Sequence, residues 1–115
     1  MSISNLFTRL MGGSSLPAIE HDDMIKACEG NDFHIVDVRE PNEFASGHVP
    51  KAKNHPLSRF DAAALPQDKP VILICQAGGR SAKALQNALS TGRTDIAHYA
   101  GGTGGWKARG GKIVM

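Results

Sequence analysis

The stretch of this 115-residue chain that decides the fold is Val71-Ile72-Leu73-Ile74-Cys75-Gln76-Ala77-Gly78-Gly79-Arg80-Ser81. Its first five residues are apolar at every position, which is typical of a central strand covered on both faces of a parallel sheet. Residues 76–80 predict a tight loop, and residues 81–90 predict a helix that turns Ala82, Leu85 and Leu89 inward. A strand, a tight turn and a helix in this order indicate an α/β fold.

Shorter strands and helices alternate on both sides of this stretch. Apolar periodicity and the spacing of Gly and Pro residues predict strands at 18–20, 33–38, 52–54, 96–99 and 113–115. The same signals predict helices at 21–29, 41–46 and 58–65, and a last short helix that follows residues 101–106. We therefore expect an α/β fold in which helices flank both faces of a central, mostly parallel sheet.

The composition is that of one globular domain, since 41% of the residues are hydrophobic and 21% are charged. The net charge of +2 is dispersed, which gives little support to nucleic-acid binding. The longest aliphatic run, at 71–74, is too short to cross a bilayer, and no signal-peptide pattern opens the chain. We therefore expect a cytoplasmic protein with reduced thiols that binds neither nucleic acid nor membrane.

Residues 1–16 differ from the rest of the chain. A Gly-Gly-Ser-Ser linker at 12–15 follows apolar residues with helical spacing at Ile3, Leu6, Phe7, Leu10 and Met11. We interpret 1–16 as an amphipathic segment with a flexible linker, and 17–115 as the folded domain. Because the segment carries a single cation, docking on this domain or on a partner is favoured over a membrane anchor. A short helix or a frayed tail is the simplest interpretation.

The two cysteines, Cys28 and Cys75, lie in different sequence contexts. Cys75 ends the central strand, where open α/β sheets bind their ligands, and a glycine loop leads from it into a helix. Backbone N–H groups of such a loop and the positive end of the helix both stabilise a thiolate, so we predict a reactive Cys75. Cys28 lies on the apolar face of the predicted 21–29 helix and is expected near the core. Neither cysteine has metal-ligand spacing, so no metal or other cofactor is expected.

Four motifs resemble those of single-domain rhodaneses, and they occur in the family's order. The loop at 75–81, C-Q-A-G-G-R-S, is similar to the family's active-site loop C-x-x-G-x-R-S. D-V-R-E-P-N-E-F at 37–44 and G-H-V-P-K-A-K-N at 47–54 resemble D-V-R-E-x-x-E-F and G-H-I-P-G-A-x-N. G-G-T-G-G-W-K-A-R-G at 101–110 resembles the closing motif G-G-x-x-x-W-x-x-x-G. The resemblance covers about residues 17–115; a departure is Lys51, which replaces a common glycine and is expected to alter a turn.

The resemblance implies a sulfurtransferase with a rhodanese-like fold. In that family the cysteine takes the outer sulfur of thiosulfate or of another persulfide donor, and cyanide or a thiol then removes it. Cys75 is by this resemblance the nucleophile, and the cradle around its sulfur is formed by the amides of Gln76, Ala77, Gly78, Gly79, Arg80 and Ser81. The implied partners are a small anionic sulfur donor, a thiol or cyanide acceptor, and a sulfur-relay protein.

Charged residues near the motifs have expected supporting roles. Asp37 is expected to brace the loop rather than act as an acid, and Arg39 to pair with a carboxylate or to contact the substrate. Arg80 either attracts the anionic donor or braces the loop through Asp37 or Glu40, and the sequence favours neither role. Trp106 is expected in the core. No metal-ligand spacing links the histidines His34, His48, His55 and His98.

Two other functions are alternatives to sulfur transfer. Dual-specificity phosphatases resemble this fold and also hold a cysteine in an anion cradle, but their loop C-x-x-x-x-x-R is one residue longer than 75–80. A regulatory module that binds or carries sulfur is the second alternative, and it ranks lower because Cys75 is present. The shorter loop favours a single sulfur over a phosphoryl group, so sulfur transfer is the leading hypothesis.

Overall fold

The computed structural model describes residues 16–115, so the predicted amphipathic segment lies outside the described residues. Parallel strands form one sheet in the order β2-β1-β3-β4. Their bounds are β1 His34–Asp37, β2 Lys53–Asn54, β3 Val71–Ile74 and β4 Ile96–His98. Strand β3 lies between β1 and β4 and is buried at every position, as its uninterrupted apolar sequence predicts.

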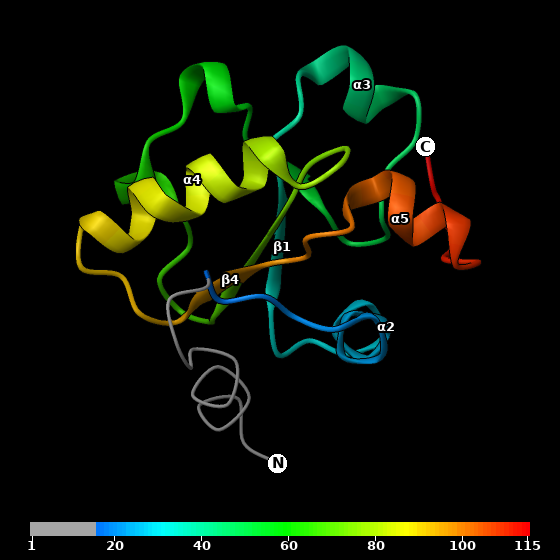
Figure 1. The fold of residues 1–115 in the computed structure, drawn as a ribbon, viewed down its shortest axis with the longest axis horizontal. Helices are drawn as coiled ribbons and strands as arrows, with labels where there is room; N and C mark the ends of the chain where they lie inside the picture. Colours follow the sequence, from blue (N-terminus) through cyan, green and yellow to red (C-terminus); the bar gives the residue numbers. More distant parts are fainter. Residues whose placement is uncertain (1–15) are drawn as a thin grey trace.

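Helices cover both faces of the sheet, which confirms the predicted fold class. Their bounds are α2 His21–Glu29, α3 Pro41–Ala45, α4 Gly79–Ser90 and α5 Gly102–Ala108. Successive residues of β3 face opposite layers, since Ile72 packs with Met24 of α2 and Trp106 of α5, whereas Leu73 packs with Leu85 of α4. Figure 1 shows α4 and α2 on opposite sides of the strands. Within residues 16–115, no helix is both long enough and apolar enough to span a bilayer.

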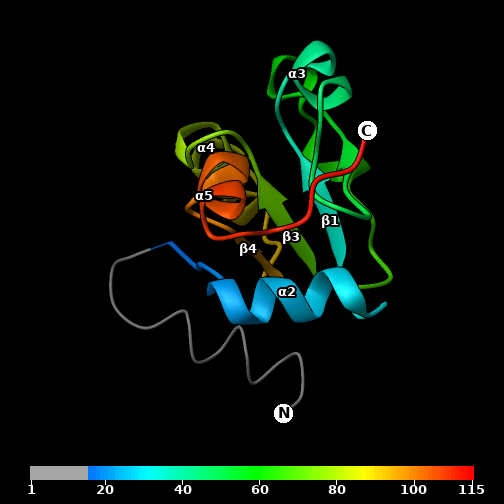
Figure 2. The same ribbon diagram turned by 90° about the vertical axis from the view of Figure 1, so that its right-hand side faces the viewer.

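The sheet is less extended at its edges than the sequence predicts. The predicted strands at 18–20 and 113–115 do not form. Each segment makes only a single bridge, from Ala18 to His98 and from Val114 to His48. Figure 2 shows the C-terminal segment running from α5 towards α3, where the second of these bridges lies. Each bridge still ties a terminal segment to the sheet or to the loop after α3.

The predicted helix at 58–65 is wrong. Two 3-10 turns, Leu57–Arg59 and Ala62–Ala64, occupy this region instead. Phe60 and Asp61 between the turns have extended backbones, and the Asp61 carboxylate accepts the N–H of Ala63. A short acidic side chain that bonds to a nearby backbone N–H competes with continuous helix, which explains the interruption.

Helix α4 begins at Gly79, two residues before the predicted start. Its buried residues are Ser81, Ala84, Leu85 and Ala88, so Leu85 faces inward as predicted, whereas Ala82 and Leu89 are only half-buried. The small side chains at 84 and 88 allow the helix to lie close to β3 and β4. The buried face of α4 includes Ser81, which therefore lies towards the end of β3, where the candidate site is.

Candidate active site

The chain turns sharply after β3, and Cys75 is the first residue of this turn. Gly78 has a φ of 101°, in the left-handed region that glycine adopts without strain. A Cβ atom at Gly78 would also overlap the carbonyl oxygen of Ala100. The turn brings the Gly78 N–H back to the sulfur of Cys75, and α4 begins at the next residue. Glycine at this position is therefore required for the shape of the cradle.

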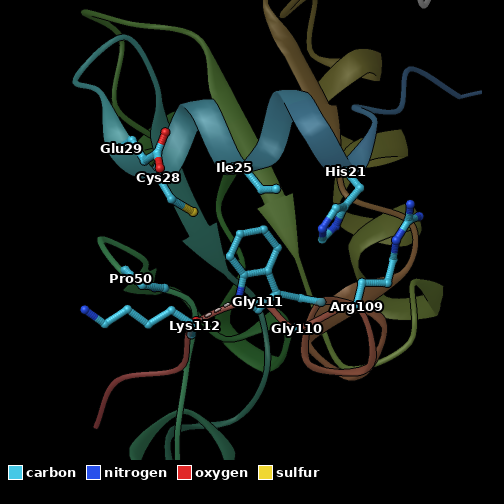
Figure 3. A pocket seen from close by; sticks show the side chains of 10 residues that line it. His21, Ile25, Cys28, Glu29, Pro50, Arg109, Gly110, Gly111 and Lys112 are labelled. Carbon is cyan, nitrogen blue, oxygen red and sulfur yellow. Dashed lines mark hydrogen bonds between the residues drawn. The ribbon is translucent and has the colours of Figure 1, made fainter.

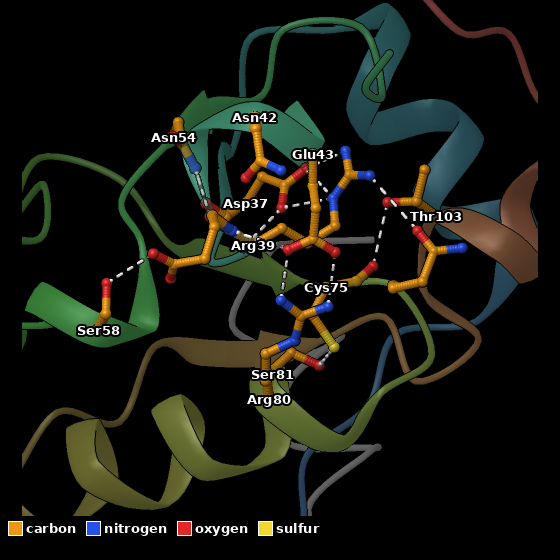
Figure 4. Close-up of polar contacts among 12 residues, drawn as sticks. Asp37, Arg39, Asn42, Glu43, Asn54, Ser58, Cys75, Arg80, Ser81 and Thr103 are labelled. Atoms are coloured by element: carbon orange, nitrogen blue, oxygen red, sulfur yellow. Dashed lines mark hydrogen bonds and ion pairs between the residues drawn. The ribbon is translucent and has the colours of Figure 1, made fainter. Parts of the chain in front are cut away.

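The Cys75 sulfur is buried among hydrogen-bond donors. It accepts from the Gly78 N–H at 3.1 Å. It also lies 3.5 Å from Oγ of Ser81 (Figure 4). Burial raises the pKa of the Cys75 thiol, but the Ser81 hydroxyl and the backbone N–H groups of Ser81, Ala77 and Gly78 outweigh this effect, so the pKa lies below its ordinary value. The positive end of α4 acts in the same direction. The site therefore stabilises the thiolate of Cys75 relative to that of an ordinary cysteine.

Cys28 has the opposite environment. Burial raises the pKa of its thiol to about 11, although the charge of Lys51 opposes this shift. Cys28 lines a cavity of about 440 Å³ between α2 and the residues that follow α5, together with Ile25 and Trp106 (Figure 3). Its side chain packs against the core, as predicted, and the thiol is protonated at neutral pH.

The N-terminus of α5 donates hydrogen bonds to the backbone of the Cys75 loop. The backbone N–H and the hydroxyl of Thr103 both donate to the Cys75 carbonyl oxygen, at 2.8 and 3.0 Å, and the N–H of Gly104 donates to the Gln76 carbonyl at 3.1 Å. Gly102 has a φ of 69°, and a Cβ atom there would overlap the Gln76 backbone. The glycine-rich run before Trp106 therefore permits close approach of two backbones, in addition to starting a helix.

Arg80 is bonded to Glu43, which was not among its expected partners. Its two terminal nitrogens donate to the two carboxylate oxygens of Glu43, at 2.6 and 2.9 Å (Figure 4). The hydrogen bonds from Arg80 lower the pKa of Glu43 to about 2. Asp37 and Glu40, the expected partners, are engaged elsewhere, with Arg39 and Ser58 respectively. The geometry supports the bracing role of Arg80 and corrects its partner to Glu43 of α3.

Asp37 and Arg39 form a buried ion pair at the end of β1. Asp37 is fully buried and Arg39 is 4% exposed, and the shortest of their contacts is 2.8 Å. Arg39 also donates to the carbonyl oxygen of Gly47 at 2.8 Å and to Oε1 of Gln76 at 3.4 Å. The pair thus connects β1, the loop after α3 and the Cys75 loop, which agrees with the expected bracing role of Asp37.

Of the predicted cradle residues, Ala77, Gly78 and Ser81 have backbone N–H groups that act on the Cys75 sulfur. The site also contains three side chains that the motifs did not assign. Glu43 holds Arg80, Thr103 holds the Cys75 carbonyl, and His98 contacts Ser81 through Nδ1 at 2.8 Å. Only Glu43 had a signal in the sequence, since it belongs to the D-V-R-E-x-x-E-F segment. In the part of the chain that the structure describes, no cluster of three or more His, Cys, Asp or Glu residues could hold a metal ion.

Comparisons with known proteins show which family this chain belongs to. A sequence model described as Rhodanese-like domain matches residues 20–109. The protein slr1261 of Synechocystis sp. is 45% identical over 78 residues, which are 66% of this chain and 44% of that protein. YqhL of Bacillus subtilis is 44% identical over 81 residues, which are 69% of this chain and 62% of that protein. The chain therefore spans about half the length of these two relatives.

Two further relatives have names that refer to the same family. GlpE of Pseudomonas aeruginosa, named a thiosulfate sulfurtransferase, is 29% identical over 89 residues, covering 75% of this chain and 80% of GlpE. The crystal structure of a rhodanese-related protein from Thermoplasma volcanium is 31% identical with a TM-score of 0.74, covering 84% of this chain and 96% of that chain. This chain belongs to the rhodanese-like domain family, in which sulfurtransferases occur.

Proposed function

We propose that this protein is a sulfurtransferase that carries a sulfane sulfur as a persulfide on Cys75. The observation that carries the proposal is the Cys75 sulfur itself, which lies at the carboxyl end of β3, accepts the Gly78 N–H at 3.1 Å and has a lowered pKa. Donors that stabilise a thiolate also stabilise the anionic sulfur of a persulfide. The family match and the relative named a thiosulfate sulfurtransferase give further support.

The proposed reaction has two nucleophilic steps. The Cys75 thiolate attacks the outer sulfur of thiosulfate, so that a new S–S bond to Cys75 forms, the S–S bond of thiosulfate breaks, and sulfite leaves with the electron pair. Cyanide or a thiolate acceptor then attacks the outer sulfur and removes it as thiocyanate or as a new persulfide. The Cys75 thiolate is restored, and the sulfur is passed on without an external oxidant or reductant.

The contacts around Cys75 suit a small donor. Cys75 is 1% exposed, so a donor has to present a narrow terminal sulfur rather than a bulky group. The Arg80 guanidinium is held by Glu43, and the loop N–H groups are therefore the donors that we expect to receive the anion. We propose a small anionic sulfur donor, a thiol or cyanide as acceptor, and a sulfur-relay protein as an acceptor in the cell.

Mass spectrometry after incubation with thiosulfate tests the proposal. We expect the wild-type protein to gain the mass of one sulfur atom and to lose it to cyanide as thiocyanate. Cys75→Ser is expected to gain no sulfur, whereas the matched control Cys28→Ser is expected to load as the wild type does, because the Cys28 thiol is protonated. Wild-type loading by Cys75→Ser would overturn the proposal, and equal loss in both variants would indicate a two-cysteine relay.

A further inference from the structure

Buried hydrogen bonds connect Cys75 to a histidine on the neighbouring strand. Oγ of Ser81 lies 3.5 Å from Sγ of Cys75 and 2.8 Å from Nδ1 of His98. Ser81 is fully buried and His98 is 6% exposed. The three side chains come from three elements: Cys75 follows β3, Ser81 lies in the first turn of α4, and His98 ends β4. The sulfur-transfer steps described above do not use His98.

The single hydroxyl hydrogen of Ser81 has three possible acceptors: Nδ1 of His98, the sulfur of Cys75, and the carbonyl oxygen of Gly78 at 3.2 Å. Two of the resulting arrangements connect Cys75 to His98. When Cys75 is a thiol, its S–H donates to Oγ of Ser81, and the Ser81 O–H donates to Nδ1 of a neutral His98. When Cys75 is a thiolate, a protonated His98 donates from Nδ1 to Oγ, and the Ser81 O–H turns towards the sulfur. The arrangements differ by two proton shifts, from Sγ to Oγ and from Oγ to Nδ1, which together carry one proton from Cys75 to His98.

We propose that Ser81 and His98 form a buried proton relay for Cys75. The relay takes up the thiol proton when the nucleophile forms and returns it when the thiol is restored. Its purpose rests on the proposed sulfurtransferase function. The relay itself is a property of the Cys75 thiol, however, and it can be measured without any sulfur transfer.

Within residues 16–115, the segments paired with β4 at His98 present no titratable side chain to it. On one side His98 pairs with Leu73 of β3, and on the other with Pro17 and Ala18. The charged side chain next to Ser81 in α4, Arg80, is held by Glu43. Burial lowers the pKa of His98. A protonated His98 is therefore stable only while a thiolate balances its charge, which couples the two titrations.

The rate of alkylation of Cys75 by iodoacetamide, measured against pH and mapped by peptide mass spectrometry, tests the relay. His98→Asn is the informative variant, because Asn can keep a hydrogen bond to Ser81 but cannot take up a proton. We expect His98→Asn and Ser81→Ala each to move the midpoint of the pH profile for alkylation of Cys75 upward by about one pH unit, which slows alkylation about tenfold at pH values well below the midpoint. The double variant is expected to be no slower than the slower single variant, because both residues act in one chain.

His34→Asn is the matched control, because His34 lies at the start of β1 and is bonded to Asp68. It is expected to alkylate as the wild type does. Alkylation of His98→Asn at the wild-type rate at every pH, with Ser81→Ala slowed, would assign the effect to Ser81 alone and overturn the relay.

Nuclear magnetic resonance of the imidazoles gives a second measurement, which leaves Ser81 and His98 unsubstituted. We expect Nδ1 of His98 to stay protonated over the pH range in which the thiolate forms, and to lose its proton at a lower pH in Cys75→Ser. A His98 that is neutral wherever the thiolate is present would overturn the relay. An intact relay in a protein that does not load sulfur would contradict the proposed function and leave the relay standing.

Discussion

The ion pair between Arg80 and Glu43 determines whether the Arg80 charge braces the Cys75 loop or attracts an anionic donor. Both terminal nitrogens of Arg80 are bonded to Glu43, at 2.6 and 2.9 Å. A guanidinium held in this two-pronged way fixes the Cys75 loop against α3, and it is less free to attract an anionic donor. Bracing and attraction predict different results when either partner is substituted.

Arg80→Ala and Glu43→Gln are each expected to lower both kcat for sulfur transfer and the melting temperature, because either change releases the brace. Attraction by charge would instead raise KM for thiosulfate in Arg80→Ala, less so at high salt, and lower it in Glu43→Gln. Steady-state kinetics at low and high salt, with thermal melts, distinguish the two roles. Opposite shifts in KM at unchanged melting temperature would contradict bracing.

The same ion pair predicts how stability depends on pH. Hydrogen bonds from Arg80 lower the pKa of Glu43 from 4.5 to about 2 in the folded protein. A carboxylate with a lowered pKa stabilises the fold above its unfolded pKa, and this contribution is lost as the pH falls through the folded value. Both side chains are about one-third exposed, so we expect only about 0.2–1 kcal/mol. The melting temperature of the wild type should exceed that of Glu43→Gln above pH 4.5, and the two should converge towards pH 2. A constant difference would contradict the pKa assignment.

Among the elements, the turn between β3 and α4 requires glycine at position 78 but not at position 79. Gly78→Ala is expected to lower the free energy of unfolding by about 1–3 kcal/mol, because an alanine would be strained at the φ of 101° and would overlap the Ala100 carbonyl. It should also raise the pKa of Cys75, because the N–H donor moves away. Chemical denaturation and the pH dependence of alkylation measure the two effects.

Gly79→Ala is the matched control for this turn. A Cβ atom at Gly79 would meet nothing within 4 Å, and the residue begins a regular helix. Alanine there is expected to leave the stability unchanged or to raise it by up to about 1 kcal/mol. Equal destabilisation by both alanines would show that both glycine positions reject a side chain, and the special role of Gly78 would be wrong.

The length of the same turn separates sulfur chemistry from phosphorus chemistry. Electrostatic catalysis needs donors about 2.7–3.1 Å from the developing charge, and the Gly78 N–H already reaches the Cys75 sulfur at 3.1 Å. We expect the wild type to form thiocyanate but not to hydrolyse aryl phosphates, and one glycine inserted after Gly78 to weaken sulfur transfer. Aryl phosphate hydrolysis by the wild type that is lost in Cys75→Ser would contradict this expectation.

For the whole molecule, the buried pair of Asp37 and Arg39 connects the sheet to the site. Asp37→Asn leaves the Arg39 charge buried without a carboxylate, and we expect a loss of about 3–5 kcal/mol in the free energy of unfolding. Adding Arg39→Met should recover part of this loss, because the unpaired charge is then removed. Denaturant titrations measure both. A double variant that is less stable than Asp37→Asn would contradict this account.

Asp95→Asn offers a control with the same spacing in the sequence. Asp95 pairs with Arg93, also two residues away, but its side chain is 45% exposed. The side chain of Arg93 is 8% exposed, and its hydrogen bonds to the carbonyl oxygens of Pro66 and Lys69 remain when the exposed carboxylate is neutralised. We therefore expect a loss of about 0–1 kcal/mol. A loss as large as that of Asp37→Asn would show that burial of the carboxylate does not determine how much free energy of unfolding is lost.

Local patterns predict most of the elements correctly. Strand β3 follows from an unbroken apolar run, α2 from apolar residues with helical spacing, and the turn at Gly78 from its glycines. The 58–65 region was predicted as a helix, because the pattern did not include the competing bond from the Asp61 carboxylate to a backbone N–H. The buried face of α4 was predicted only in part, because it depends on how closely the helix packs on β3 and β4.

The sequence by itself determines the α/β order of the elements, the family and the loop that holds Cys75, because these depend on residue types at fixed spacing along the chain. Only the tertiary structure decides that Glu43 receives Arg80, that Thr103 holds the Cys75 carbonyl and that His98 contacts Ser81. These contacts depend on the strand order β2-β1-β3-β4, which places the end of β3 between the end of β1, followed by α3, and the end of β4, followed by α5. Residues far apart in the chain meet there because neighbouring parallel strands end at the same edge of the sheet.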